Sequence, residues 1–224
     1  MTDLDIRRSN NGWIQPLERP ALAWLVRRLP GWATPAQLTI VGFAGALVAF
    51  AGYALAARNL AWLWLATLGL AINWFGDSLD GTLARHRKIE RVRFGYYLDN
   101  TIDVVEQFLL AVAIGLSGII RWDLSFLGLA VFLMISLLSF IRASVSGEFQ
   151  IAYGGIGLTE FRIVLIILNA LVFCIPPERL DWFALPMTYQ NILSITWSIL
   201  TLITFLFGWI TQLRKLAAED PPHA

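Results

Sequence analysis

Six apolar stretches, each long enough to cross a lipid bilayer as a helix, recur along the chain. A membrane-spanning helix needs about 20 apolar residues and satisfies its backbone polar groups internally. The composition agrees, since 57% of the residues are hydrophobic and 15% are charged, against about 25% charged in ordinary soluble domains. We expect spans at residues 36–57, 60–82, 96–118, 124–145, 160–177 and 190–212. The sequence therefore predicts an all-α integral membrane protein that forms a six-transmembrane-helix bundle.

This bundle is expected to form one domain, residues 36–213, between an N-terminal segment, residues 1–35, and a cytoplasmic tail, residues 214–224. Within the N-terminal segment, apolar residues and arginines are mixed from Gln15 to Leu29. We interpret this stretch as an interfacial amphipathic helix on the cytoplasmic leaflet. The alternative is a packed N-terminal helix with a solvated basic edge. The Thr34–Gln37 sequence then has the cap, the proline and the glutamine of a helix start.

The basic residues are distributed unevenly between the two sides of this bundle. Of the 17 Lys and Arg residues, only Arg58, Arg121 and Arg179 fall on the side opposite the termini. Cytoplasmic loops of membrane proteins are enriched in Lys and Arg, so we expect both termini to face the cytoplasm, in a bacterial inner membrane. The net charge of +1 gives no indication of a nucleic-acid partner. The single cysteine, Cys174, excludes an intrachain disulfide and is expected to be a buried thiol.

Four aspartates lie where the second and third predicted spans reach the cytoplasmic side, and carboxylates are costly so close to a membrane. They are Asp77, Asp80, Asp99 and Asp103. Spacings of three and four residues place the members of each pair on one helix face. Two such helices facing each other would gather four negative charges, which need compensation. Carboxylates without His or Cys favour one or two Mg²⁺ or Mn²⁺ ions. The alternative is that each aspartate pairs with an arginine of residues 85–93.

These aspartates belong to a longer pattern over residues 77–103. It reads Asp77, two residues, Asp80-Gly81, two residues, Ala84-Arg85, nine residues, Gly95, three residues, Asp99, three residues and Asp103. The pattern resembles the signature of the CDP-alcohol phosphotransferase family, with all eight diagnostic residues in order. The resemblance implies an integral-membrane enzyme of phospholipid biosynthesis. Such an enzyme would move a phosphatidyl group from CDP-diacylglycerol, or another CDP-alcohol, to a small polar alcohol and release CMP. It also implies a homodimer among membrane lipids.

The resemblance further implies roles for the residues of the pattern. The four aspartates would bind the metal, and Asp103 would also be the base that accepts the proton of the acceptor hydroxyl. The CDP portion would be bound by Asp80, Gly81, Ala84, Arg85 and Gly95. Two alternatives stay open. Gly81 and Ala84 could serve helix packing as small residues one turn apart, and Asp103 could be a metal ligand only.

The acceptor pocket is predicted from polar residues in and near the spans, because such residues inside a membrane are commonly functional. The candidates are Asn73, Asn100, Glu106, Arg142 and Arg162, with Glu148 and Tyr153 as weaker ones. In family members that accept inositol phosphate or glycerol phosphate, basic residues of this half bind the acceptor phosphate, as Arg142 or Arg162 could. Structural alternatives are a hydrogen-bonded bundle carboxyl for Glu106 and a contact with lipid headgroups for Arg142. Arg162 could instead pair with Glu160 or Glu148.

Residues Gly154 to Glu160 have the composition of a tight turn and a helix start, with Thr159 as the expected cap of the fifth span. The Leu158–Glu160 sequence is also loosely similar to aminoalcohol phosphotransferases. One alternative function is therefore the transfer of a CDP-choline or CDP-ethanolamine headgroup to diacylglycerol. A cation transporter that uses the aspartates is the alternative of a different class. Inverted repeats and broken helices, which transporters often have, are not evident in the sequence.

Overall fold

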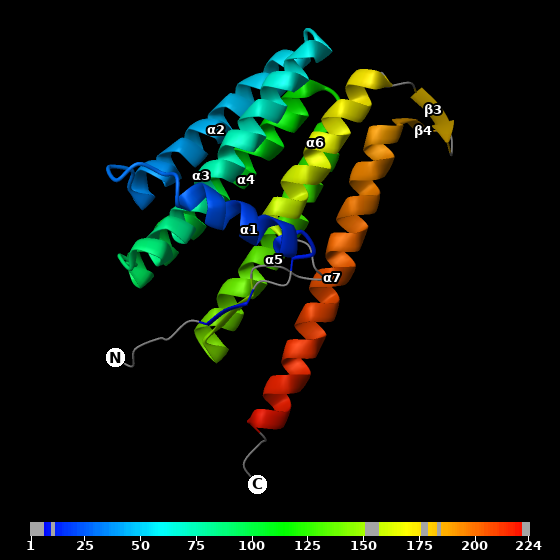
Figure 1. The fold of residues 1–224 in the computed structure, drawn as a ribbon. Helices are drawn as coiled ribbons and strands as arrows, with labels where there is room; N and C mark the ends of the chain where they lie inside the picture. Colours follow the sequence, from blue (N-terminus) through cyan, green and yellow to red (C-terminus); the bar gives the residue numbers. More distant parts are fainter. Residues whose placement is uncertain (1–6, 10–11, 151–156, 176–178, 183–184, 221–224) are drawn as a thin grey trace.

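The computed structural model describes residues 7–9, 12–150, 157–175, 179–182 and 185–220. Most residues of that part of the chain lie in α-helices. They are α1 (Gln15–Val26), α2 (Pro35–Ala56), α3 (Leu63–Arg87), α4 (Val92–Ser117), α5 (Trp122–Ser146), α6 (Leu158–Cys174) and α7 (Tyr189–Glu219), with a 3₁₀ turn at Leu60–Trp62. Figure 1 shows α2 to α7 running side by side as a bundle, with the short α1 lying across it. The predicted all-α class is confirmed.

Four of these helices, α2, α4, α5 and α7, are long and apolar enough to cross a membrane by length and composition. The second and fifth predicted spans correspond to α3 and α6. Helix α6 has 17 residues, and α3 carries two aspartates and ends in Arg85, His86 and Arg87. The count of six spans therefore stays a prediction. Helix α7 continues to Glu219 and so includes much of the segment that was expected to be a tail.

Helices α2 and α3 approach so closely that backbone meets backbone. Five glycines lie at this crossing, and we call them the glycine seam: Gly42, Gly45, Gly52, Gly69 and Gly76. A Cβ atom added to Gly69 would lie 2.2 Å from the Ala49 nitrogen, and one added to Gly76 would lie 2.2 Å from the Gly42 nitrogen. Only residues without a side chain fit such a contact. The glycine seam therefore fixes Asp77, directly after Gly76, relative to α2.

Helix α1 packs on the end of the bundle that carries the aspartates. Its Leu22 and Val26 are buried in a cluster with side chains of α2 and α3, namely Leu38, Leu79 and Leu83. The linker from α1 to α2 is tied to the end of α3, because the Arg87 guanidinium donates hydrogen bonds to the carbonyls of Pro30, at 2.9 Å, and Ala33. The helix in the N-terminal segment thus forms, and its placement on a membrane leaflet stays a prediction.

The predicted start of α2 is confirmed. Thr34 is the N-cap, its Oγ1 accepts a hydrogen bond from the Gln37 N–H, and the Gln37 side chain accepts one from the Thr34 N–H at 2.8 Å. Thr159, in contrast, is not the cap of α6. That helix follows an extended Gly157, whose N–H donates to Glu160 Oε2 at 2.9 Å. A glutamate three residues into the helix therefore does the capping.

Two further features differ from expectation. Cys174 is exposed, so the prediction of a buried thiol was wrong; it is the last residue of α6, where the chain leaves the bundle. Two pairs of short strands also form. Strand β1 (Arg7–Ser9) runs parallel to β2 (Glu148–Gln150), and β3 (Arg179–Trp182) runs antiparallel to β4 (Leu185–Thr188). Strands of three or four residues leave little signal in a sequence, and β1 and β2 are in addition far apart along the chain.

Candidate active site

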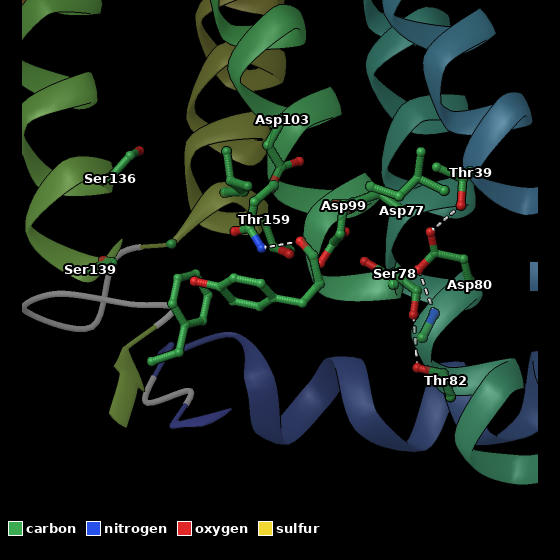
Figure 2. A pocket seen from close by; sticks show the side chains of 18 of the residues that line it. Thr39, Asp77, Ser78, Asp80, Thr82, Asp99, Asp103, Ser136, Ser139 and Thr159 are labelled. Carbon is green, nitrogen blue, oxygen red and sulfur yellow. Dashed lines mark hydrogen bonds between the residues drawn. The ribbon is translucent and has the colours of Figure 1, made fainter. Parts of the chain in front are cut away.

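A large cavity opens at the end of the bundle that α1 crosses. Its volume is about 1220 Å³, somewhat above the usual range of small-molecule sites, about 300–1,000 Å³. Its walls come from α1, the start of α2, the last turns of α3, the first half of α4, parts of α5 and α7, and the first turn of α6. Figure 2 shows polar side chains of several of these helices around the space. The cavity is large enough for a nucleotide together with part of a second substrate.

Three of the four predicted aspartates meet at the cavity wall. Asp77 comes from α3, while Asp99 and Asp103 come from α4, and one carboxylate oxygen of each lies within 4.8 Å of the others. All three side chains are half-buried and line the cavity (Figure 2). Mg²⁺ binds oxygen ligands at about 2.0–2.1 Å, so ligands on opposite sides of the ion are about 4 Å apart. Three carboxylates this close together could hold one ion, and a set of oxygen ligands of this kind suits Mg²⁺ or Mn²⁺.

Asp80 lies one turn further along α3, outside this group of three carboxylates. Its Oδ2 accepts a hydrogen bond from the Thr39 hydroxyl at 2.6 Å, and its Oδ1 accepts one from the Gly81 N–H (Figure 2). Asp80 nevertheless lines the cavity. A metal centre of four aspartates would require Asp80 to reach the ion from this position. The four-aspartate centre therefore stays a prediction.

The residues predicted to bind the nucleotide all line the cavity. They are Asp80, Gly81, Ala84, Arg85 and Gly95. A Cβ atom on Gly95 would meet nothing within 4 Å, and one on Gly81 would meet only the Arg85 side chain, at 3.2 Å. Contact between helices therefore does not require glycine at either position. The close approach of a ligand does require a small residue, so the observation favours nucleotide binding over helix packing for Gly81.

Arg162 lies behind the three carboxylates rather than in the cavity wall. It is 5% exposed, and its Nη1 is 2.7 Å from Asp77 Oδ2 while its Nη2 is 3.9 Å from Glu106 Oε2. Glu106 also accepts a hydrogen bond from Asn73 Nδ2 at 2.8 Å, and that same nitrogen lies 3.0 Å from the Gly42 carbonyl. Asn73, Glu106 and Arg162, three predicted acceptor residues, are thus joined in one network with Asp77, and these contacts favour the structural role for Glu106. The partner of Arg162 is Asp77, which was not among the partners weighed from the sequence.

The remaining predicted acceptor residues are scattered. Asn100 lines the cavity, and its Nδ2 donates to the Tyr96 carbonyl at 2.6 Å. Arg142 lies near the C-terminal end of α5 and is half-buried. Of Glu148, only the backbone in β2 is described, and Tyr153 lies outside the described residues. The acceptor pocket therefore stays a prediction.

Comparison with known proteins agrees with this geometry. The sequence model of the CDP-alcohol phosphatidyltransferase family matches residues 32–212, which is most of the chain. The chain belongs to this family. One relative, an archaetidylinositol phosphate synthase of Pyrococcus horikoshii, is 39% identical over 160 residues, 70% of this chain and 77% of the relative. An archaetidylinositol phosphate synthase of Methanothermobacter thermautotrophicus is 30% identical over 179 residues, 79% of this chain and 86% of that relative.

Membership of the CDP-alcohol phosphatidyltransferase family confirms the resemblance seen in residues 77–103. It makes the chain a transferase of phospholipid synthesis with a CDP-alcohol donor and an alcohol acceptor. The family and the apolar helices together indicate an integral membrane protein. Members of the family use a divalent metal, and the group of Asp77, Asp99 and Asp103 could bind one.

Two polar residues of this phosphatidyltransferase were missed by the sequence reasoning. Thr39 donates to Asp80, as described above. Glu18, on α1, lines the cavity, and its Oε1 accepts hydrogen bonds from Trp74, Ser78 and Thr159. These contacts join residues 41 to 141 positions apart. The local pattern around Glu18 and Thr39 does not reveal such partners.

Proposed function

We propose that this phosphatidyltransferase moves a lipid phosphate group from a CDP-activated lipid to inositol phosphate, with release of CMP. The observation that carries the proposal is the meeting of Asp77, Asp99 and Asp103 in a cavity that the predicted nucleotide-binding residues also line. The acceptor is inferred from the two relatives, both of which are named archaetidylinositol phosphate synthase. The donor carries the archaetidyl lipid named for those relatives or the diacylglycerol expected from the sequence.

In this proposal Asp77, Asp80, Asp99 and Asp103 hold one or two Mg²⁺ or Mn²⁺ ions. When bound, the metal neutralises the pyrophosphate of the donor and the charge that develops during transfer. Asp103 accepts the proton of the acceptor hydroxyl. The acceptor oxygen then bonds to the phosphorus that bears the lipid alcohol, the bridging P–O bond breaks, and CMP leaves with that oxygen.

The charges around the cavity support a site for phosphorylated substrates. Three basic residues, Arg19, Arg85 and Arg91, line it together with the acidic group, and guanidinium groups are well suited to bind phosphate. Among the predicted acceptor residues, Asn100 lines the cavity and is our candidate for contact with a substrate, while Arg142 and Arg162 stay candidates for the acceptor phosphate. We further propose that this end of the bundle faces the cytoplasm and that the protein is a homodimer.

A test uses the purified protein in detergent with Mg²⁺ or Mn²⁺ and either CDP-diacylglycerol or CDP-archaeol. Inositol phosphate, glycerol phosphate, serine and free inositol are compared as acceptors, with CMP release and the lipid product as readouts. We expect CMP and a new phosphorylated lipid with inositol phosphate only. Turnover with serine or glycerol phosphate instead would reject the acceptor, and cation uptake into vesicles without CMP release would reject the enzyme.

A further inference from the structure

Helix α1 contributes an acidic residue that joins two other helices at the edge of the cavity. Glu18 lies in the first turn of α1, is half-buried and lines the cavity. Its Oε1 accepts three hydrogen bonds: from Trp74 Nε1 at 2.7 Å, from Ser78 Oγ at 3.0 Å and from Thr159 Oγ1 at 3.1 Å. Hydrogen bonds to a charged acceptor are stronger than neutral ones. A single carboxylate oxygen on α1 therefore ties α3 to the first turn of α6.

This contact stands directly beside the ion pair between Asp77 and Arg162. Ser78 follows Asp77 on α3, and Thr159 lies three residues before Arg162 on α6, a spacing that places both on one helix face. The Arg162–Asp77 pair, 2.7 Å long, thus joins the same two helices that Glu18 joins. Glu18 and the Arg162–Asp77 pair therefore link α3 to the start of α6 at two adjacent positions.

A second contact holds α1 against the same turn of α6. The N–H of Ile14, the N-cap of α1, donates to Glu160 Oε1 at 3.1 Å, while Glu160 Oε2 accepts the Gly157 N–H. Glu160 is buried, with 3% of its surface exposed. The start of α1 and the start of α6 are therefore joined twice, once through Glu160 and once through Glu18. Both links hold the first turn of α6, directly before Arg162, against α1.

We propose that Glu18 is a positioning residue of the metal centre, and this inference rests on the metal site of the proposed function. Through Ser78 and Thr159, Glu18 keeps α3 and α6 at the separation where Arg162 holds Asp77 Oδ2. With that oxygen held, the orientation of the Asp77 carboxylate toward Asp99 and Asp103 is fixed before an ion binds. Partners that orient metal ligands from outside the ligand set typically change metal affinity by about 10–100-fold when they are removed.

The test measures Mn²⁺ binding to the full-length protein in detergent, without substrates, by electron paramagnetic resonance of free Mn²⁺. Glu18→Ala removes the one oxygen that accepts all three hydrogen bonds and should weaken Mn²⁺ binding by about 10-fold. Glu18→Gln keeps a carbonyl oxygen and should lie within about threefold of the unchanged protein, because neutral hydrogen bonds to Ser78 and Thr159 can still form. Equal losses in both variants, or no loss in Glu18→Ala, would overturn the inference.

A matched control separates positioning from general loosening of α1. Val26→Ala removes apolar contact at the far end of α1, where Val26 is 3% exposed, and should lower the melting temperature while Mn²⁺ binding is unchanged. Equal weakening by Val26→Ala would overturn the inference. Should Glu18→Ala not yield folded protein, Thr159→Val removes one hydrogen bond at nearly constant shape, and a smaller weakening, about threefold, is expected. Unchanged Mn²⁺ binding in Thr159→Val would count against the positioning role of Glu18.

The outcome for Glu18 can be told apart from the outcome for the proposed function. Wild-type protein that binds Mn²⁺ but releases no CMP from any CDP-lipid would refute the proposed reaction, and the Glu18 variants would still decide the positioning role. Wild-type protein that binds no Mn²⁺ would overturn this inference together with the metal centre.

Discussion

The glycine seam provides a way to move the metal centre without changing any of its ligands. Gly76 directly precedes Asp77, and a Cβ atom there would lie 2.2 Å from the Gly42 nitrogen and 2.4 Å from the Leu38 carbonyl oxygen. Ordinary contacts of a Cβ atom begin near 3.4 Å. Gly76→Ala therefore requires α2 and α3 to separate by on the order of 1 Å, since both obstructing groups are backbone and cannot rotate away.

The magnitude of the effect follows from that displacement. Overpacking of this kind costs about 1–3 kcal/mol, and the better helix propensity of alanine offsets about 1 kcal/mol of it. The net loss of stability is thus at most about 2 kcal/mol, and the protein should still fold. Misplacement of reacting groups by about 1 Å can cost about 100-fold in rate. We therefore expect Gly76→Ala to lower CMP release by about 10- to 100-fold with a modest decrease in melting temperature.

Two matched variants make this prediction specific. Gly69→Ala creates the same 2.2 Å contact, with the Ala49 nitrogen, but eight residues before Asp77, which is about 12 Å along the helix. It should lower stability as much as Gly76→Ala but reduce activity far less. Gly31→Ala, where a Cβ atom meets nothing within 4 Å, should change neither. Wild-type activity in Gly76→Ala, or an equal loss in Gly69→Ala, would refute the reasoning.

Three further predictions concern the site itself. Asp103→Asn should abolish CMP release while the CDP-lipid donor still binds in equilibrium dialysis; full turnover would remove Asp103 from the mechanism. Gly95→Ala should fold normally, because nothing lies within 4 Å of the added methyl group, yet raise the KM for the CDP-lipid by about 10-fold; an unchanged KM would contradict ligand contact there. Thr39→Val removes the hydrogen bond to Asp80 and should lower kcat by less than about 10-fold with the fold intact, as judged by circular dichroism; total loss of activity would mean that Asp80 depends on Thr39 alone.

The carboxylate centre could be predicted from the sequence because its information is local. Spacings of three and four residues put Asp77 and Asp80 on one face and Asp99 and Asp103 on another, and only the pairing of the two helices had to be assumed. The structure brings the carboxylates of Asp77, Asp99 and Asp103 together. For Asp80, the hydrogen bond from Thr39 depends on the depth at which α2 packs on α3, which no spacing within α3 can reveal.

The contacts that support the carboxylate centre could not be predicted, because they too depend on how helices distant in the sequence pack together. The glycines of the seam are visible in the sequence, but small residues indicate close packing without naming the partner helix. Glu18 and Arg162 are charged residues in unremarkable surroundings, and their partners lie on other helices. One helix boundary also differs from the predicted span. Helix α3 continues to Arg87 and is followed by Lys88 in the left-handed αL conformation, whereas the predicted span ended at residue 82.

The central claim is that acidic side chains of α3 and α4 hold a divalent cation on which transfer from the CDP-lipid depends. The most direct measurement is CMP release by the purified protein after complete removal of metal, followed by titration with Mg²⁺ or Mn²⁺. The account predicts no release from the stripped protein and recovery that saturates as metal is added, with Asp77→Asn shifting the titration to higher metal concentration. Undiminished CMP release in excess chelator would contradict it.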